Sequence, residues 1–191
     1  MESKTIGFAL CGSFCTHGQA VAALEQLRAR FDHIIPIVSE NTAATDTRFG
    51  NAHDLMRELQ RICDHRVITT IKDAEPIGPQ QLLDLLIIAP CTGNTLGKLA
   101  AGIADTSVTM AAKAHLRNGK PVLIAPSTND GLSVSAPSIG KLLARKHIFF
   151  VPFGQDDPDR KPTSLISDFT LVADAAKAAL EGRQLQPVLR T

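Results

Sequence analysis

The 191-residue chain contains no tryptophan and no tyrosine, and it has only four cysteines. Without tyrosine, no phenolic hydroxyl is present to serve as a catalytic acid or base. Cys11, Cys15, Cys63 and Cys91 form no CxxC pair, and no HExxH pattern occurs, so the sequence predicts no metal site. Cysteines without such pairing are typical of a reduced, cytoplasmic compartment.

An excess of one charge is also missing, because 20 Lys and Arg residues balance 19 Asp and Glu residues and leave a net charge of +1. Such a chain has little long-range attraction for nucleic acid. No apolar run reaches the roughly 18 residues that a membrane-spanning helix needs. The opening MESKTIGFALCGS is too short for a secretory signal and is predicted to form a strand. We expect a soluble protein without nucleic-acid or membrane partners.

Short apolar runs alternate with helical patterns along the whole chain. Runs such as LLIIA and PVLIA are apolar on both faces, as in parallel strands covered by helices on either side. The sequence therefore predicts one α/β domain over residues 1–191, with a doubly wound, mostly parallel sheet between two helical layers, in a Rossmann-like fold. The predicted strands are Thr5–Cys11, His33–Val38, Leu85–Ala89, Pro121–Ala125 and His147–Val151.

Helical spacing of apolar residues predicts three surface helices, and Gly182 is predicted to end the last of them. An extended tail is expected from about residue 183. Two proline-containing stretches, Thr70–Pro79 and Gly154–Ser164, are predicted to be loops, the second a lid or a partner-binding loop. The apolar residues that mark the helices are Val21, Leu24, Leu27 and Phe31, then Leu55, Leu59 and Ile62, and finally Leu165, Phe169, Val172, Ala176 and Leu180.

Polar and small residues follow the predicted strands at the end where an open parallel sheet binds its ligands. After the first strand comes Cys11-Gly12-Ser13-Phe14, which fits either close approach to a phosphate or a tight turn with a serine cap. After the second strand, the hydroxyls of Ser39 and Thr42 could close around a monophosphate or merely cap a helix. Both interpretations stay open on these residues alone.

The segment from Ile87 to Asp105 avoids bulk where a buried strand meets a helix. Pro90 and Cys91 are followed by the polar residues Thr92, Asn94 and Thr95. Small residues let a backbone lie against a flat ring, while hydroxyls and an amide can pair with the ring's polar edge. This turn is therefore predicted to lie along an isoalloxazine.

This turn resembles a motif of the flavoprotein family that includes the cysteine-decarboxylating enzymes of peptide modification and coenzyme A synthesis. That family has a Pro-Ala-Ser-Ala-Asn-Thr loop followed by Lys-x-Ala-x-Gly-x-x-Asp, and here Pro90–Thr95 and Lys98–Asp105 agree in order and spacing. Its Pro-x-Met-Asn motif is similar to Pro126–Asn129, with Thr128 in place of Met. The resemblance implies bound flavin mononucleotide (FMN), with Asn129 facing flavin and substrate, and a homo-oligomer in which the apolar helix Ser107–Leu116 is a candidate contact.

One departure from the family concerns its catalytic histidine. The decarboxylases carry it a few residues before the Asp that opens the strand leading into the motif, and here that stretch, Glu75–Pro79, contains no histidine. No catalytic residue is assigned. Decarboxylation of a cysteinyl substrate would need His53 or His115 as a relocated base, and a further alternative is a scaffold subunit without chemistry of its own.

The stretches AEPIGP, MAAKAHLRNGKPV and FFVPFGQDDPDRKP are similar to one branch of the family, a component of a two-component oxidoreductase in endospore-forming bacteria. This resemblance implies dehydrogenation of a small dicarboxylate together with a partner A subunit that carries NADP, in the mother-cell cytoplasm. The planar guanidinium of Arg48 suits a substrate carboxylate if it faces the pocket, and otherwise is a solvated surface charge.

Overall fold

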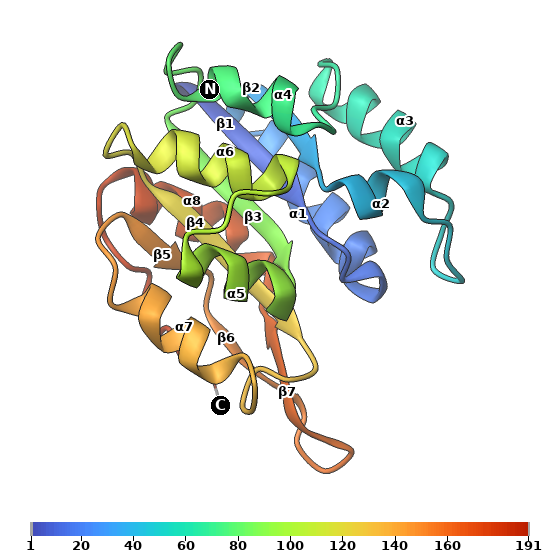
Figure 1. Ribbon diagram of the computed structural model, residues 1–191, viewed down its shortest axis with the longest axis vertical. Coiled ribbons are helices and arrows are strands. Elements are labelled where there is room, and N and C mark those ends of the chain that lie inside the picture. Colours follow the sequence, from blue (N-terminus) through green and yellow to red (C-terminus); the bar gives the residue numbers. More distant parts are fainter. Residues whose placement is uncertain (1, 191) are drawn as a thin grey trace.

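The centre of the molecule is a seven-stranded sheet with helices on both faces (Figure 1). A computed structural model describes residues 2–190. The sheet has the order β2-β1-β3-β4-β7-β6, and β5 also pairs with β4. Its strands are β1 (Glu2–Leu10), β2 (Phe31–Val38), β3 (Leu85–Cys91), β4 (Val122–Thr128), β5 (Ile148–Phe150), β6 (Phe153–Asp157) and β7 (Lys161–Ser167).

Strands β1 to β5 run parallel, which confirms the predicted doubly wound fold. Alternate residues of β1 point to opposite faces, because side chains alternate along a strand. Ile6, Phe8 and Leu10 enter one hydrophobic core, whereas Ala9 and Cys11 enter the other. The two cores lie on the two faces of the sheet, so the central strands β1, β3 and β4 are apolar on both sides.

Helices cover both cores and complete three layers (Figure 1). In Figure 1 the helices α4 to α7 lie in front of the sheet, and α8 lies behind it. The first core is covered by α1 (His17–Arg28), α3 (Ala52–Cys63) and α8 (Val172–Leu180). The second is covered by α4 (Ile71–Ala74), α5 (Gly93–Ala101), α6 (Ser107–Leu116) and α7 (Ala136–Leu143). A short α2 (Glu40–Ala44) follows β2, and the 3-10 turns are η1 (Phe14–Thr16), η2 (Glu75–Ile77) and η3 (Phe169–Leu171).

The prediction was wrong for Phe31, which opens β2 and does not belong to the first helix. Helix α1 ends at Arg28, whose guanidinium donates hydrogen bonds to the carbonyls of Phe31 (3.1 Å) and Asp32 (2.8 Å). Phe31 is buried in the same core as the apolar face of α1. Its spacing matched the helix because both elements contribute to one core.

The prediction was also wrong for the stretch Gly154–Ser164, most of which belongs to the antiparallel hairpin β6–β7. Strand β7 is held in place because Ser127 and Thr128 of β4 pair with it. Leu165, assigned from sequence to the last helix, is buried within β7, and the helix starts only at Val172. The tip of the hairpin projects from the body at the bottom of Figure 1.

The loop predicted over Thr70–Pro79 contains two helical turns, α4 and η2. Thr70 caps α4, because its hydroxyl accepts a hydrogen bond from the Asp73 N–H at 3.1 Å. The end predicted at Gly182 is confirmed in position, since α8 ends at Leu180 and Gly182 has a left-handed φ of 72°.

Helix α6 has the predicted bounds. Val108, Ala111 and Ala112 are buried in the second core, while Met110 and Leu116 are half-buried. A contact between copies of the chain through this helix stays a prediction. Across residues 2–190, no helix has the length and apolar character needed to cross a membrane. The tail beyond α8 packs on the sheet, where the Gln184 side chain accepts from the N–H of Phe150 and donates to its carbonyl.

Candidate functional site

The candidate site lies where β1 and β3 end, which is the point at which the strand order reverses. The parallel strands follow the order 2-1-3-4-5, and such sheets bind ligands at this switch point beyond the carboxyl ends of the strands. The two ends are close together, since the Cys11 N–H donates to the Pro90 carbonyl at 3.3 Å. A cavity of about 640 Å³ opens there, and we call it the switch-point cavity. Its lining residues include Gly12, Phe14, Ser39, Glu40, Thr92, Asn94, Thr95, Lys98 and Asp105.

The turn after β2 presents two linked hydroxyls beside Gly12. Ser39 Oγ donates to Thr42 Oγ1 at 2.9 Å and accepts from the Thr42 N–H at 3.4 Å. Thr42 is only 1% exposed and is not a lining residue of the switch-point cavity, whereas Ser39 is. The helix-cap interpretation therefore describes both residues, and Ser39 is the one whose side chain also borders the cavity.

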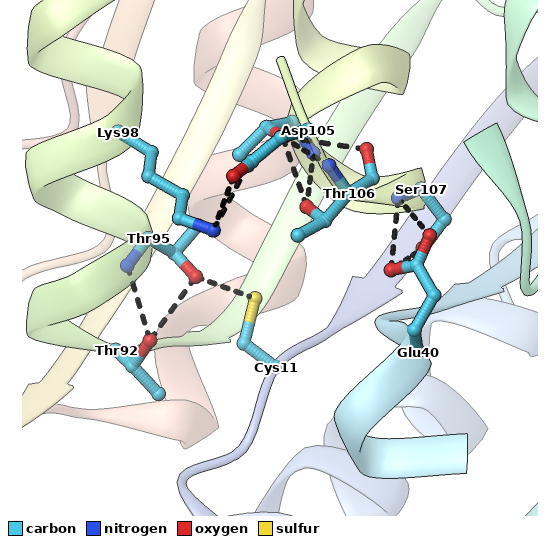
Figure 2. Close-up of polar contacts among 9 residues, drawn as sticks. Cys11, Glu40, Thr92, Thr95, Lys98, Asp105, Thr106 and Ser107 are labelled. Carbon is cyan, nitrogen blue, oxygen red and sulfur yellow. Dashed lines mark hydrogen bonds and ion pairs between the residues drawn. The ribbon is translucent and has the colours of Figure 1, made fainter. Parts of the chain in front are cut away.

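The turn after β3 is held by a chain of hydroxyl and thiol contacts (Figure 2). Thr92 Oγ1 accepts from the Thr95 N–H at 3.2 Å and donates to Thr95 Oγ1 at 3.0 Å. Thr95 Oγ1 in turn donates to Cys11 Sγ at 3.3 Å. Both hydroxyl hydrogens are thus directed into the protein, so their contacts cap α5 and join it to β1.

The residues predicted in this turn differ in how accessible their side chains are to a bound ring. Pro90 and Cys91 are fully buried within β3, which extends two residues beyond its predicted end. Thr92 lines the cavity, but its hydroxyl hydrogen is used in the bond to Thr95 Oγ1. The Asn94 side chain is exposed at the first turn of α5, where helix amides have no acceptor within the helix.

Three lining residues of the switch-point cavity, Glu40, Lys98 and Asp105, are held by contacts within the protein (Figure 2). Lys98 Nζ pairs with Asp105 at 2.8 Å, and this hydrogen bond lowers the pKa of the Asp105 carboxyl. The Glu40 carboxylate accepts from the Ser107 N–H at 2.9 and 3.1 Å, at the N-terminus of α6. An acidic group at a helix N-terminus is stabilised by the helix dipole. Both carboxylates are therefore occupied within the protein.

A second cavity of about 430 Å³ adjoins the first and shares Gly12, Phe14 and Thr92 with it. We call it the hairpin cavity, because β6 and β7 form one of its walls. The end of β4 contributes Ser127 and Thr128 to its lining, and Asn129 follows directly after the strand. The hairpin contributes Asp156, Lys161, Ser164, Leu165 and Ile166. The hydroxyl of the predicted residue Ser13 also lies here, 2.8 Å from Ser127 Oγ.

Arg48 is exposed, and its guanidinium carbon lies 4.8 Å from the centroid of the Phe49 ring. Phe49 lines the hairpin cavity, but Arg48 is not among the lining residues of that cavity or of the switch-point cavity. The structure therefore brings Asn129 to the site and leaves Arg48 on the adjacent surface.

A carboxylate that the sequence did not single out links the turns after β3 and β4. Asp130 Oδ1 accepts from Thr128 Oγ1 at 2.5 Å and from Ser135 Oγ at 2.8 Å, and these bonds lower the pKa of the Asp130 carboxyl. Gly93 lies against this cluster, since a Cβ on it would fall 2.6 Å from Asp130 Oδ1. The only sequence signal was the position of Asp130 directly after Asn129.

The histidines considered as relocated bases lie away from both cavities. His53 is exposed in the first turn of α3, as predicted, and its side chain is 77% accessible. His115 is fully buried and contacts the carbonyl of Pro121 at 2.9 Å, at the opposite end of β4. His17, which the sequence interpretation missed, donates from Nε2 to the Cys11 carbonyl at 2.8 Å and packs on Phe14. Burial lowers the pKa of His17.

The cysteines differ sharply in their availability. Burial raises the pKa of Cys11 to about 11 and that of Cys63 to about 12, and it raises the pKa of Cys91 well above its usual value. Cys15 is exposed. Because the thiolate is the reactive species, we expect a thiol reagent at pH 7.5 to modify Cys15 quickly and the other three only after unfolding. The Cys15→Ser variant should lose the fast phase, and a second fast thiol in the folded protein would contradict this.

The fold defines an α/β protein with the strand order of a flavodoxin-like sheet and a cavity at its switch point. The model of the family described as Flavoprotein matches residues 1–179, and the chain belongs to that family. It is similar to the B subunit of dipicolinate synthase from Bacillus subtilis (strain 168), with 40% identity over 189 residues, 99% of this chain and 94% of that protein.

Solved structures agree with this relationship. The crystal structure of the dipicolinate synthase B subunit from Bacillus halodurans C matches with a TM-score of 0.90 and 40% identity, covering 98% of this chain and 96% of that one. The FMN-dependent cysteine decarboxylase SpaF matches with a TM-score of 0.71 at 20% identity, covering 94% of this chain and 97% of that one. At that identity the second match shows the shared fold alone.

Proposed function

We propose that this chain is the FMN-binding B subunit of a dipicolinate synthase, working with a partner A subunit that binds NADP. The pair would dehydrogenate a dihydrodipicolinate-type intermediate to dipicolinic acid in the mother-cell cytoplasm of a sporulating bacterium. The similarity to the B subunits of two Bacillus species over nearly the full length of each chain is the observation that carries this proposal.

The residues at the switch point fit a flavin nucleotide. Gly12 and Ser39 both line the cavity and suit its phosphate, because they combine close backbone approach with a hydroxyl. Thr42 supports this turn from behind through its hydrogen bonds with Ser39. The turn after β3 suits its ring, with Asn94 offering a side-chain amide. When bound, the flavin supplies the capacity to accept and pass on a hydride equivalent. The chain's own residues bind and orient.

The proposed reaction removes two hydrogens from the ring of the substrate. One leaves with an electron pair as hydride to NADP⁺, and the other leaves as a proton to solvent, so that the ring becomes aromatic. This chemistry depends more on positioning than on a proton-transfer residue. It suits a site in which Glu40 and Asp105 are already paired within the protein.

The test of the cofactor is the absorption spectrum of the purified protein after incubation with FMN and removal of free FMN. We expect a flavin spectrum, and Asn94→Ala should weaken FMN binding about tenfold because it removes one side-chain hydrogen bond to the ring. Thr45→Val, at an exposed position that does not line the cavity, is the control and should bind FMN normally. A protein without flavin after this treatment would refute the proposal.

The carboxylates of Glu40 and Asp105 are both paired within the protein, and this favours a second candidate function. In it, this chain is a scaffold and the A subunit performs all chemistry. Assays of the A subunit alone, with this chain, and with its Asn94→Ala variant separate the two. If FMN on this chain takes part, the rate should depend on this chain and fall with FMN occupancy. If this chain is a scaffold, the rate should depend on its presence but not on bound FMN.

A further inference from the structure

The hairpin cavity contains an unusual arrangement of charge for a small pocket. Among its described lining residues, Lys161 carries the one positive charge and Asp156 the one negative charge. The Lys161 Nζ lies 2.5 Å from Asp156 Oδ2, and this contact raises the pKa of Lys161, so the ammonium stays charged at neutral pH. An ammonium has three donors, and Asp156 uses one of them. Two donors of Lys161 are left for a ligand.

The opposite wall of the hairpin cavity is a cluster of hydroxyls. Thr16 Oγ1 donates to the Ser13 carbonyl at 2.9 Å, which commits its hydrogen. Ser127 Oγ lies 2.8 Å from Ser13 Oγ and 3.2 Å from Thr16 Oγ1, and it can donate to either. When it does so, the hydrogen of Ser13 is free to face the cavity. The exposed side chain of Asn129 adds amide donors to the same space.

From these groups we infer that the hairpin cavity binds a single-ring dicarboxylate, with Lys161 holding one carboxylate while Ser13 and Asn129 hold the other end of the ligand. The inference rests on the proposed function and assigns a position to its substrate. A cavity of about 430 Å³ lies in the size range of small-molecule sites. It meets the switch-point cavity at Gly12, Phe14 and Thr92, so the ligand lies next to the proposed flavin position.

Lys161 replaces Arg48 as the carboxylate-binding residue in this assignment. Arg48 is exposed beside the Phe49 ring and is absent from the lining of the cavity. The hairpin supplies specificity, because a monocarboxylate would leave the Lys161 ammonium without an added partner. Lys161 is therefore a specificity-determining residue of the proposed reaction.

The experiment measures binding of pyridine-2,6-dicarboxylate to the full chain by calorimetry, in buffer free of divalent cations. Lys161→Met should weaken binding about tenfold, as expected for one hydrogen bond between charged groups. Asp156→Asn should tighten binding severalfold, because it removes the charge that competes for the ammonium. The control is Arg160→Gln, which removes a neighbouring cation that pairs with Asp157 and is not a lining residue, and it should change binding less than twofold.

A second ligand, pyridine-2-carboxylate, tests the role in specificity. The wild type should prefer the dicarboxylate, and Lys161→Met should lose that preference. The inference is overturned if the wild type does not bind the dicarboxylate, or if Lys161→Met and Arg160→Gln behave alike. FMN binding by the wild type is measured separately by absorption. If the wild type binds no FMN but Lys161→Met still weakens dicarboxylate binding, the cofactor proposal is refuted. If the wild type binds FMN but Lys161→Met has no effect on dicarboxylate binding, this inference alone is refuted.

Discussion

Replacing Gly93 by alanine should destabilise the protein by about 3 kcal/mol and weaken FMN binding. The added Cβ would fall 2.4 Å from Ser135 Oγ, 2.6 Å from Asp130 Oδ1 and 2.7 Å from Thr128 Oγ1. These atoms cannot move apart independently, because Asp130 accepts hydrogen bonds from both of the others. Either the cluster breaks or the first turn of α5 shifts away from the switch point. Urea unfolding measures the first effect and FMN titration the second.

The same helix offers a matched control in Gly97. A Cβ at that position would meet nothing nearer than Ser138 Oγ at 4.0 Å. Alanine is a better helix former than glycine, so Gly97→Ala should leave the stability unchanged or raise it by up to about 1 kcal/mol. Equal stabilities for the two variants would show that the contact between α5 and the Asp130 cluster does not constrain the site.

A second large effect is expected from His115 when the pH is lowered. Burial is the main cause that lowers the pKa of His115 to about 4, from an ordinary value of 6.5, and the nearby charge of Lys120 contributes in the same direction. The carbonyl of Pro121 and the charge of Asp84 oppose the shift. The unfolded chain therefore takes up this proton at a higher pH than the folded chain does. The resulting stability is present above pH 6.5 and is lost as the pH falls towards 4.

Over that interval the linkage predicts a loss of about 3 kcal/mol from this one residue. His115→Gln keeps a donor near the Pro121 carbonyl but cannot be protonated. The difference in unfolding free energy between wild type and His115→Gln should therefore shrink by about that amount between pH 7 and pH 4. His53→Gln, at an exposed position, should keep the acid sensitivity of the wild type. A constant difference between wild type and His115→Gln would contradict the linkage.

The parallel part of the fold was predictable because a strand buried between two helical layers needs apolar residues on both faces, and the sequence shows such runs directly. Val122 and Ile124 of β4 must be apolar on one face, and Leu123 and Ala125 on the other, so the run itself indicates a buried parallel strand. The hairpin was not predictable in this way. Its residues Asp156 to Pro162 are polar and exposed, and β7 is positioned by backbone pairing with β4, which leaves no periodic signal in the sequence.

The sequence predicted which strand ends come together at the candidate site, but it could not predict what each side chain contacts there. Gly12, Ser39 and Asn94 follow strand ends, and the sheet brings them to one cavity. The sequence could not show which hydroxyl hydrogens are used within the protein, as for Thr92, because those bonds depend on neighbours far along the chain. Lys161 was missed for the same reason, since only the hairpin brings it to the turns after β1 and β4.

Strand β4 pairs with different strands along its two halves. Its first half, Val122 to Ile124, pairs with β5 in the core, and its second half, Ser127 and Thr128, pairs with β7. The outer end of the hairpin can consequently change in length or sequence with little cost to folding, as exposed loop tips generally can. Within this architecture, the hairpin tip can diverge in sequence while the parallel strands and their buried cores are inherited unchanged.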